Sequence, residues 1–95
     1  MQKLFNHFNK LVFDDMLPKV PLSRADLRQH AAWGAFWPNS RCIQIEETLT
    51  EDQVPAVLLH EMVHLEQSIR GQAVHHNAFF RRRTQECLSL TGLSI

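Results

Sequence analysis

One five-residue motif constrains both the fold and the chemistry of this chain. Residues 60–64 spell His-Glu-Met-Val-His and follow directly on the apolar residues 54–59, which favours a buried helix. Residues four apart lie on one face of an α-helix, so His60 and His64 would point in the same direction, with Glu61 beside them. Two imidazoles at this spacing can hold one metal ion, and a neighbouring carboxylate can act on a water molecule next to it. The motif therefore predicts a metal-dependent hydrolase.

The flanking residues predict a helix from about residue 51 to residue 68. The segment 50–53 resembles a capping box, and Pro55 is tolerated only in a first turn, with Asp52 as a second candidate cap. Gly71 is suited to the left-handed conformation that ends many helices. A motif this short also arises by chance, so two metal-free histidines on a partly apolar helix face remain the alternative.

Size and composition describe one small domain with balanced charge. A 95-residue chain buries only about 60–65% of the surface that it exposes when unfolded, so a bound metal would also stabilise the fold. Ten Lys and Arg residues balance ten Asp and Glu residues, so the net charge does not indicate DNA binding, although it does not rule out DNA as a partner. The basic cluster Arg81 to Arg83 is expected to form a solvated helix face.

The cysteines and the N-terminal residues predict a cytoplasmic protein. Cys42 and Cys87 form no C-x-x-C pair, which favours two reduced thiols over a disulfide framework or a zinc ribbon. Residues 1–10 lack the apolar core of a signal peptide. No apolar stretch approaches the ~20 residues that span a bilayer, so no membrane role is expected. Nothing in the sequence indicates the oligomeric state.

Two further helices are expected, one at each end of the chain. Apolar residues recur at steps of three and four between residues 1 and 14, which indicates an opening amphipathic helix. Asn77 would cap a last helix that stops at Gly92. The inner face of that last helix would comprise Phe80, Cys87 and Leu88.

Strands are expected between the first helix and the H-E-x-x-H helix. Residues 20–24 suit a short edge strand, because Pro21 and the preceding Pro18 are poorly suited to a central strand. Residues 31–37 and 41–46 suit a hairpin around the turn residues 38–40. The expected fold is therefore α+β. It is a single small zincin-like domain over residues 1–95, with an N-terminal helix, a short antiparallel sheet, the H-E-x-x-H helix and a C-terminal helix.

A catalytic zinc site needs a third protein ligand and one open position, so a further His, Asp or Glu must follow the motif. The metzincin pattern requires Gly and His at positions where this chain has Gln67 and Arg70, so that subclass is excluded.

Three downstream residues compete for the third position. Glu86 loosely matches the glutamate ligand of gluzincins, but it can pair with Arg82 or Arg83 one turn earlier, which favours a solvated salt bridge. His75 and His76 are the other two candidates.

The segment around these histidines resembles one family. His76, Asn77 and Phe80 match the histidine, small turn residue and aromatic residue that follow the H-E-x-x-H helix in SprT-like zinc metallopeptidases. Asn77 suits a helix cap, and Phe80 would anchor the new helix in the core. The opening helix, the hairpin and the tail also resemble those of compact bacterial and phage members of this family. These compact members are similar to the catalytic domain of Spartan proteases. The likeness covers nearly the whole chain.

The resemblance implies a zinc metallopeptidase, and an endopeptidase is expected. Its substrates would be flexible or unfolded proteins, including DNA-associated protein. Glu61 would be the catalytic base. The implied metal ligands of one Zn²⁺ per chain are His60, His64 and His76. His75 and Glu86 stay open as replacements for His76. Longer relatives carry a zinc ribbon or DNA-binding extensions that this sequence lacks, so recruitment to DNA is not implied.

A competing interpretation is a catalytically silent, zinc-stabilised binding or adaptor module. Its metal would be structural and closed by a fourth ligand such as His75 or Glu86, but a structural site has no need of the Glu61 carboxylate. The sequence contains no tyrosine, so an oxyanion would be stabilised by His75, by Arg41 or by the metal alone.

The protein or peptide substrate would lie extended along an exposed sheet edge. Trp33, Phe36 and Trp37 could line that cleft, but core packing is the expectation for aromatic residues at a strand. His7 and His30 lie in polar surroundings and are expected at the surface.

Overall fold

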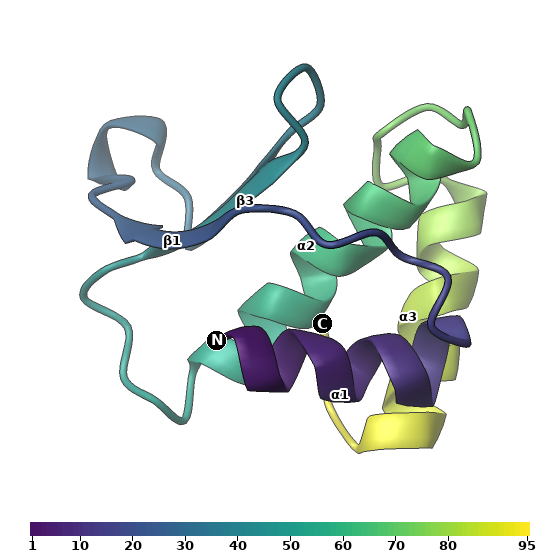
Figure 1. The fold of residues 1–95 in the computed structure, drawn as a ribbon. Helices are drawn as coiled ribbons and strands as arrows, with labels where there is room; N and C mark the ends of the chain where they lie inside the picture. Colours follow the sequence, from purple (N-terminus) through teal and green to yellow (C-terminus); the bar gives the residue numbers. More distant parts are fainter.

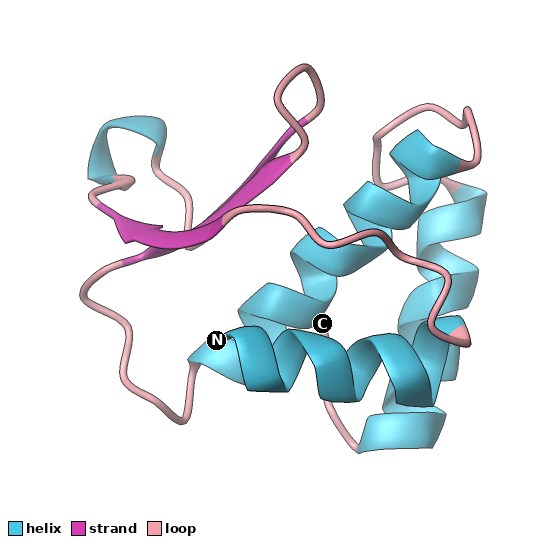
Figure 2. Cartoon of the chain, viewed as in Figure 1, coloured by secondary structure: helices cyan, strands magenta, loops and turns pink.

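Three helices and a three-stranded sheet make up the domain (Figures 1 and 2). The computed structural model describes residues 1–95. In chain order the elements are α1 (Gln2–Phe13), β1 (Leu22–Ala25), the short 3₁₀ helix η1 (Arg28–His30), β2 (Gly34–Trp37), β3 (Cys42–Glu46), α2 (Val54–Ile69) and α3 (Ala78–Thr91). Helix α2 lies at the centre and contacts the sheet, α1 and α3. The predicted α+β class and element order are confirmed.

The sheet is mixed, not wholly antiparallel as expected. Its strand order is β1-β3-β2, and the predicted hairpin is present, with β2 antiparallel to β3. Strand β1 runs parallel to β3, with Leu22 opposite Ile43 and Ala25 opposite Glu46. The chain reverses direction between β1 and β2, and it reverses again in the hairpin between β2 and β3. Strand β3 therefore runs in the same direction as β1, and it lies between β1 and β2 in the sheet. Hydrophobic patterning predicts strands but does not fix this order.

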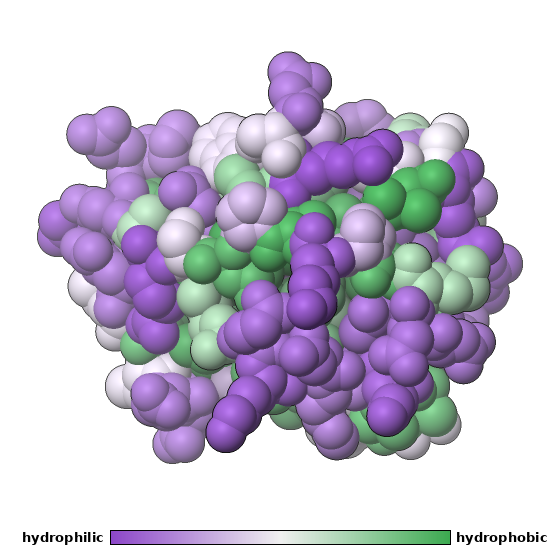
Figure 3. All heavy atoms as spheres, in the orientation of Figure 1, coloured by the Kyte–Doolittle hydropathy of each residue, from purple (hydrophilic) through white to green (hydrophobic).

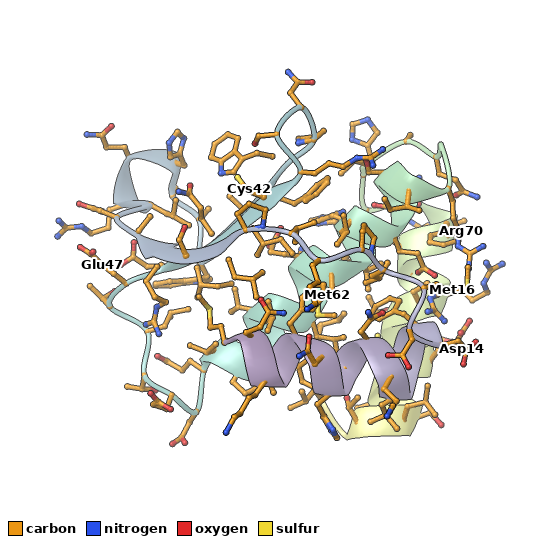
Figure 4. The ribbon with its side chains drawn as sticks, viewed as in Figure 1. Asp14, Met16, Cys42, Glu47, Met62 and Arg70 are labelled. Atoms are coloured by element: carbon orange, nitrogen blue, oxygen red, sulfur yellow. The ribbon has the colours of Figure 1, made fainter.

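The buried core forms around α2. Several α2 residues are completely buried, namely Leu58, Leu59, Met62, Val63 and Leu65. A helix that is apolar on most sides is typical of one enclosed by other elements. Figure 4 shows Met62 at the centre of the domain, between α2 and α1. Polar side chains cover most of the outer face drawn in Figure 3, and apolar atoms show through between them.

A buried asparagine fixes how the chain leaves α1. The Asn9 side chain donates to the carbonyl of Leu17 (2.9 Å) and accepts from the N–H of Leu17 (3.1 Å). Asp14 and Asp15 both adopt positive φ angles, which end the helix and turn the chain back towards the sheet. This paired contact satisfies a polar side chain inside the core and sets the path into β1.

The ends of α2 and α3 match most of the expected signals. Pro55 lies in the first turn of α2, but the cap residue Gln53 forms no side-chain cap, and neither does Asp52. Only half of the capping box is present, because Gln53 Oε1 accepts from the Thr50 N–H (2.9 Å) ahead of the helix. Gly71 follows α2 with φ +69°, as its predicted role requires.

Helix α3 begins after Asn77 and ends at Gly92, as predicted, but the prediction for one residue of its inner face was wrong. Asn77 accepts from the N–H of Phe80 (3.1 Å), and Gly92 ends the helix in the left-handed conformation. Phe80 and Cys87 are buried, whereas Leu88 is 50% exposed. Each helical residue advances about 100°, so Leu88 falls well round from the inner stripe that Phe80 and Cys87 share.

None of the three helices combines the length and apolar character that a membrane crossing requires. Both cysteines are free; Cys87 is buried and Cys42 is half-buried.

Candidate metal centre

Helix α2 and the loop after it bring three histidines together. His60 and His64 lie one turn apart on α2, and His76 lies in the loop just before α3. One possible ligand atom from each lies within 4.8 Å of the other two. The Nε2 atoms of His60 and His76 are 3.2 Å apart. Two nitrogens bound to one tetrahedral zinc at about 2.0–2.1 Å would lie roughly 3.3 Å apart, so the His60–His76 pair has the spacing that zinc requires, and three imidazoles are a donor set that zinc accepts.

Phe80 forms the floor of this cluster. Its ring centroid lies 4.8 Å from that of His60, 4.8 Å from that of His64 and 4.6 Å from that of His76. The Asn77 cap places Phe80 in the first turn of α3, where the buried ring supports all three imidazoles. The predicted anchoring role of Phe80 is confirmed. The buried ring covers one side of the cluster.

Two imidazoles are oriented by oxygen atoms behind them. His64 Nδ1 lies 2.8 Å from Oε1 of Gln67, and His60 Nδ1 lies 3.1 Å from the main-chain oxygen of Ile95. An acceptor at Nδ1 holds the proton there and leaves Nε2 free to bind a metal. Sequence reasoning did not find these acceptors. Gln67 had served only to exclude metzincins, and no local pattern connects Ile95 with His60.

Burial also keeps these imidazoles neutral. Desolvation lowers the pKa of His64 to about 4, against the opposing effect of the hydrogen bond that its Nδ1 donates to Gln67. Desolvation likewise lowers the pKa of His60, against its contact with Ile95. A metal ligand must be the neutral imidazole, so the site favours the form that binds.

Glu61 lies against the backbone of β2. Its burial raises its pKa to about 7, although a hydrogen bond from the backbone of Phe36 acts in the opposite direction. A Cβ atom at Gly34 would lie 3.0 Å from Oε2 of Glu61, so only glycine leaves room for this close approach. The carboxylate is therefore held beside the histidine cluster, at the edge of the sheet.

An open cleft of about 360 Å³ adjoins Glu61 and His60. Its eight lining residues are Trp33, Gly34, Ala56, Val57, His60, Glu61, Ser94 and Ile95. Trp33 is 65% exposed at this cleft, and Trp37 is partly exposed, so the core expectation was wrong for both. It was correct for Phe36. Trp33 lies just before β2, and Trp37 Nε1 donates to Gln44 (2.9 Å) on the neighbouring strand.

The other candidates lie outside this cluster. His75 is exposed and is not one of the three clustered histidines. Glu86 pairs with Arg82 (3.6 Å) and with Arg83, as its predicted salt-bridge role requires. His75 and Arg41, the candidates for stabilising an oxyanion, are both absent from the lining of the cleft.

Other surface expectations have mixed outcomes. His7 and His30 are exposed, as predicted. Within the basic cluster, Arg81 donates to the carbonyl of His76 (3.0 Å), and Arg83 is mostly buried against Glu66 (2.8 Å). The cluster is therefore not a free, solvated row of charges.

A carboxylate and two histidines on one buried helix, completed by a third histidine from the next segment, define a zincin-type metallopeptidase-related domain. The chain belongs to the SprT-like family, because the sequence model of that family matches residues 1–95, the whole chain. A comparison with individual curated proteins found no match. Family membership agrees with the resemblance inferred from the His76 segment.

Proposed function

We propose that this domain is a zinc-dependent metallopeptidase that cleaves flexible or unfolded protein. One observation carries the proposal: Glu61 is fixed between the β2 backbone and the three-histidine cluster, at a cleft open to solvent. A carboxylate placed in this way serves hydrolysis, whereas a binding surface does not need it. Membership of the SprT-like family supports the same conclusion.

The number of available ligands favours a catalytic site over a structural one. Structural zinc is normally closed by four protein ligands, and catalytic zinc has three with one position open. The two residues that could have closed the site are elsewhere: His75 is not part of the three-histidine cluster, and Glu86 is engaged by Arg82 and Arg83. We therefore favour the enzyme over the silent adaptor module, with one zinc held by His60, His64 and His76.

The proposed mechanism assigns a separate role to each side chain. A zinc ion held by His60, His64 and His76 would act as a Lewis acid, which would lower the pKa of a water molecule and polarise the scissile carbonyl. Glu61 accepts a proton from the attacking water and returns it to the leaving amine. His60 and His64 keep Nε2 directed into the cluster because Ile95 and Gln67 occupy the opposite ring nitrogens.

The outer edge of β2 is suited to an extended peptide. Glu46 donates its N–H to the carbonyl of Trp33 (2.8 Å), which makes these residues a hydrogen-bonded antiparallel pair. Such pairs alternate along the ladder, so the backbone groups of Gly34 and Phe36 point away from β3, towards Glu61. The Phe36 N–H already bonds to Glu61, so a substrate strand added there would pair with the backbone groups of Gly34 and the Phe36 carbonyl, next to the proposed base. This geometry selects segments that are free of secondary structure.

Two further parts of the proposal concern the surroundings of the protein. We propose a cytoplasmic location, in keeping with two free thiols. DNA is retained as a possible activator but not as a required partner, because the arginines of the basic cluster are engaged by Glu66, Glu86 and the His76 carbonyl. Glu66 and Glu86 compensate part of their charge, while Arg81 has only a neutral carbonyl partner.

The direct test is cleavage of a denatured, alkylated protein by the zinc-loaded domain, with and without single-stranded DNA. The matched control is Glu61→Gln, which keeps the size of the side chain and removes the base. We expect wild-type cleavage to exceed that of the variant by about 100-fold or more, which is typical of a lost general base.

Each result of this test has a defined meaning. Equal cleavage by both proteins would refute the role of Glu61. Cleavage that requires DNA would support the peptidase and add DNA as an activator. Absence of cleavage in both conditions, with zinc bound, would favour the adaptor module.

A further inference from the structure

Gln67 is a completely buried polar residue with three side-chain hydrogen bonds. Its Oε1 lies 2.8 Å from Nδ1 of His64, on the same helix. Its Nε2 donates to the carbonyl of His75 (2.8 Å) and to Oδ1 of Asn77 (3.1 Å). These two acceptors flank His76, so a single amide contacts one histidine of the cluster and both neighbours of another.

The hydrogen-bond network fixes the orientation of this amide. The His75 carbonyl can only accept, and Asn77 Oδ1 is fixed as an acceptor because it also receives the Phe80 N–H. Only the NH₂ group of Gln67 can serve these two partners, so its oxygen must face His64. Nδ1 of His64 must then carry the proton. The lone pair on Nε2 is therefore free and directed into the cluster.

The same contacts hold the loop that carries His76. Residues 71–77 form no helix or strand, so their position depends on specific contacts. The backbone N–H of Gln72 also donates to the Gln67 carbonyl (2.8 Å), and Asn77 Nδ2 donates to the Ala73 carbonyl (3.3 Å). The amide of Gln67 is the buried link between this loop and His64 on α2.

We propose that Gln67 is a positioning residue that preorganises the metal site in the metal-free protein. It does so by fixing the tautomer of His64 and the position of His76. This inference rests on the proposed metal site, but not on peptidase activity. A buried amide with a purely structural role would stabilise the fold without controlling either histidine. Loss of an oxygen or amide partner behind a metal ligand typically weakens metal affinity by about 10- to 100-fold.

The test measures zinc affinity by competition with a chromophoric chelator, and the His64 tautomer by ¹⁵N NMR of the metal-free protein. Gln67→Met removes all three polar contacts at similar volume. Gln67→Glu keeps an acceptor for His64 but places oxygens against the two loop acceptors. The matched control is Gln72→Met, the same replacement at an exposed position of the loop.

We expect wild-type His64 to be protonated at Nδ1 without metal. Gln67→Met should give mixed tautomers and a 10- to 100-fold loss of zinc affinity. Gln67→Glu should keep the tautomer yet lose affinity, because the loop is released. Gln72→Met should match the wild type. If Gln67→Met does not fold, the Gln67→Glu variant and the wild-type tautomer decide the matter.

Two results would overturn the proposal. The first is wild-type His64 protonated at Nε2. The second is zinc affinity within about threefold of the wild type in a folded Gln67 variant, even if its melting temperature falls. A wild-type protein that binds no zinc would refute the metal site itself, and the tautomer measurement would still show whether Gln67 controls His64.

Discussion

Gly34 on β2 leaves the space that the carboxylate of Glu61 on α2 occupies: a Cβ atom at position 34 would lie 3.0 Å from Oε2. The same Cβ would lie 2.7 Å from Cγ1 of Val57, one helical turn before Glu61. The absence of a side chain therefore lets the sheet edge approach α2, which places the backbone of β2 beside the carboxylate of Glu61.

Gly34→Ala should impair both stability and catalysis. We expect a loss of about 1–3 kcal/mol in the free energy of unfolding, because the methyl group overpacks the β2–α2 contact. Peptidase kcat should fall at least tenfold as Glu61 is displaced. Denaturant unfolding and steady-state kinetics measure the two effects. Adding Val57→Ala removes the closest clash and should restore stability; wild-type behaviour of Gly34→Ala alone would contradict this packing.

His76→Ala should abolish zinc binding, and His75→Ala should not. His76 Nε2 lies 3.2 Å from His60 Nε2, whereas His75 is exposed outside the cluster. We expect zinc content near one per chain in the wild type and in His75→Ala, measured by elemental analysis after dialysis. It should fall close to zero in His76→Ala. Retention of zinc in His76→Ala together with its loss in Glu86→Ala would transfer the third ligand to Glu86.

Arg83 should contribute far more to stability than its neighbour Arg82. Arg83 joins α3 to the buried Glu66 on α2 (2.8 Å) and to the Val12 carbonyl of α1 (3.1 Å). Arg83→Met leaves Glu66 with only the more exposed partner Arg70, so we expect the free energy of unfolding to fall by about 3–5 kcal/mol. The control Arg82→Met removes an exposed pair and should cost below about 1 kcal/mol. If urea unfolding showed similar losses of stability for Arg83→Met and Arg82→Met, the buried role of Arg83 would be contradicted.

Cys87 should resist alkylation, and its thiol should make the folded protein less stable as the pH rises above 9. Burial raises the pKa of its thiol to about 11. Between pH 9 and 11 the unfolded chain loses this proton and the folded protein retains it, so stability falls as the pH rises through that range. Relative to Cys87→Ala, the wild type should lose about 2–3 kcal/mol over this range in urea unfolding.

Iodoacetamide labelling at pH 8.5 gives a second measurement on the thiols. The half-buried Cys42 should react, and Cys87 should react only after unfolding. Equal labelling rates in the folded protein would contradict the burial of Cys87.

Local chemistry was sufficient to predict much of this domain from its sequence. The helical repeat of apolar residues located α1 and α2, Asn77 and Gly92 marked the ends of α3, and H-E-x-x-H placed two imidazoles and a carboxylate on one helix. These features depend on residues within a few positions of each other, so the sequence carries their signal directly. Leu88 was misplaced because a one-residue step changes the face of a helix.

Tertiary structure alone decided how these pieces meet. The parallel pairing of β1 with β3, the support of His60 by Ile95 and the approach of Gly34 to Glu61 join segments far apart in the sequence. Such contacts depend on the packing of the whole core, which no local pattern encodes. The sequence determined that this chain has a helix with two histidines at metal-ligand spacing and a carboxylate beside them. The folded structure determined that His76 completes the cluster and that a buried amide, from Gln67, connects its parts.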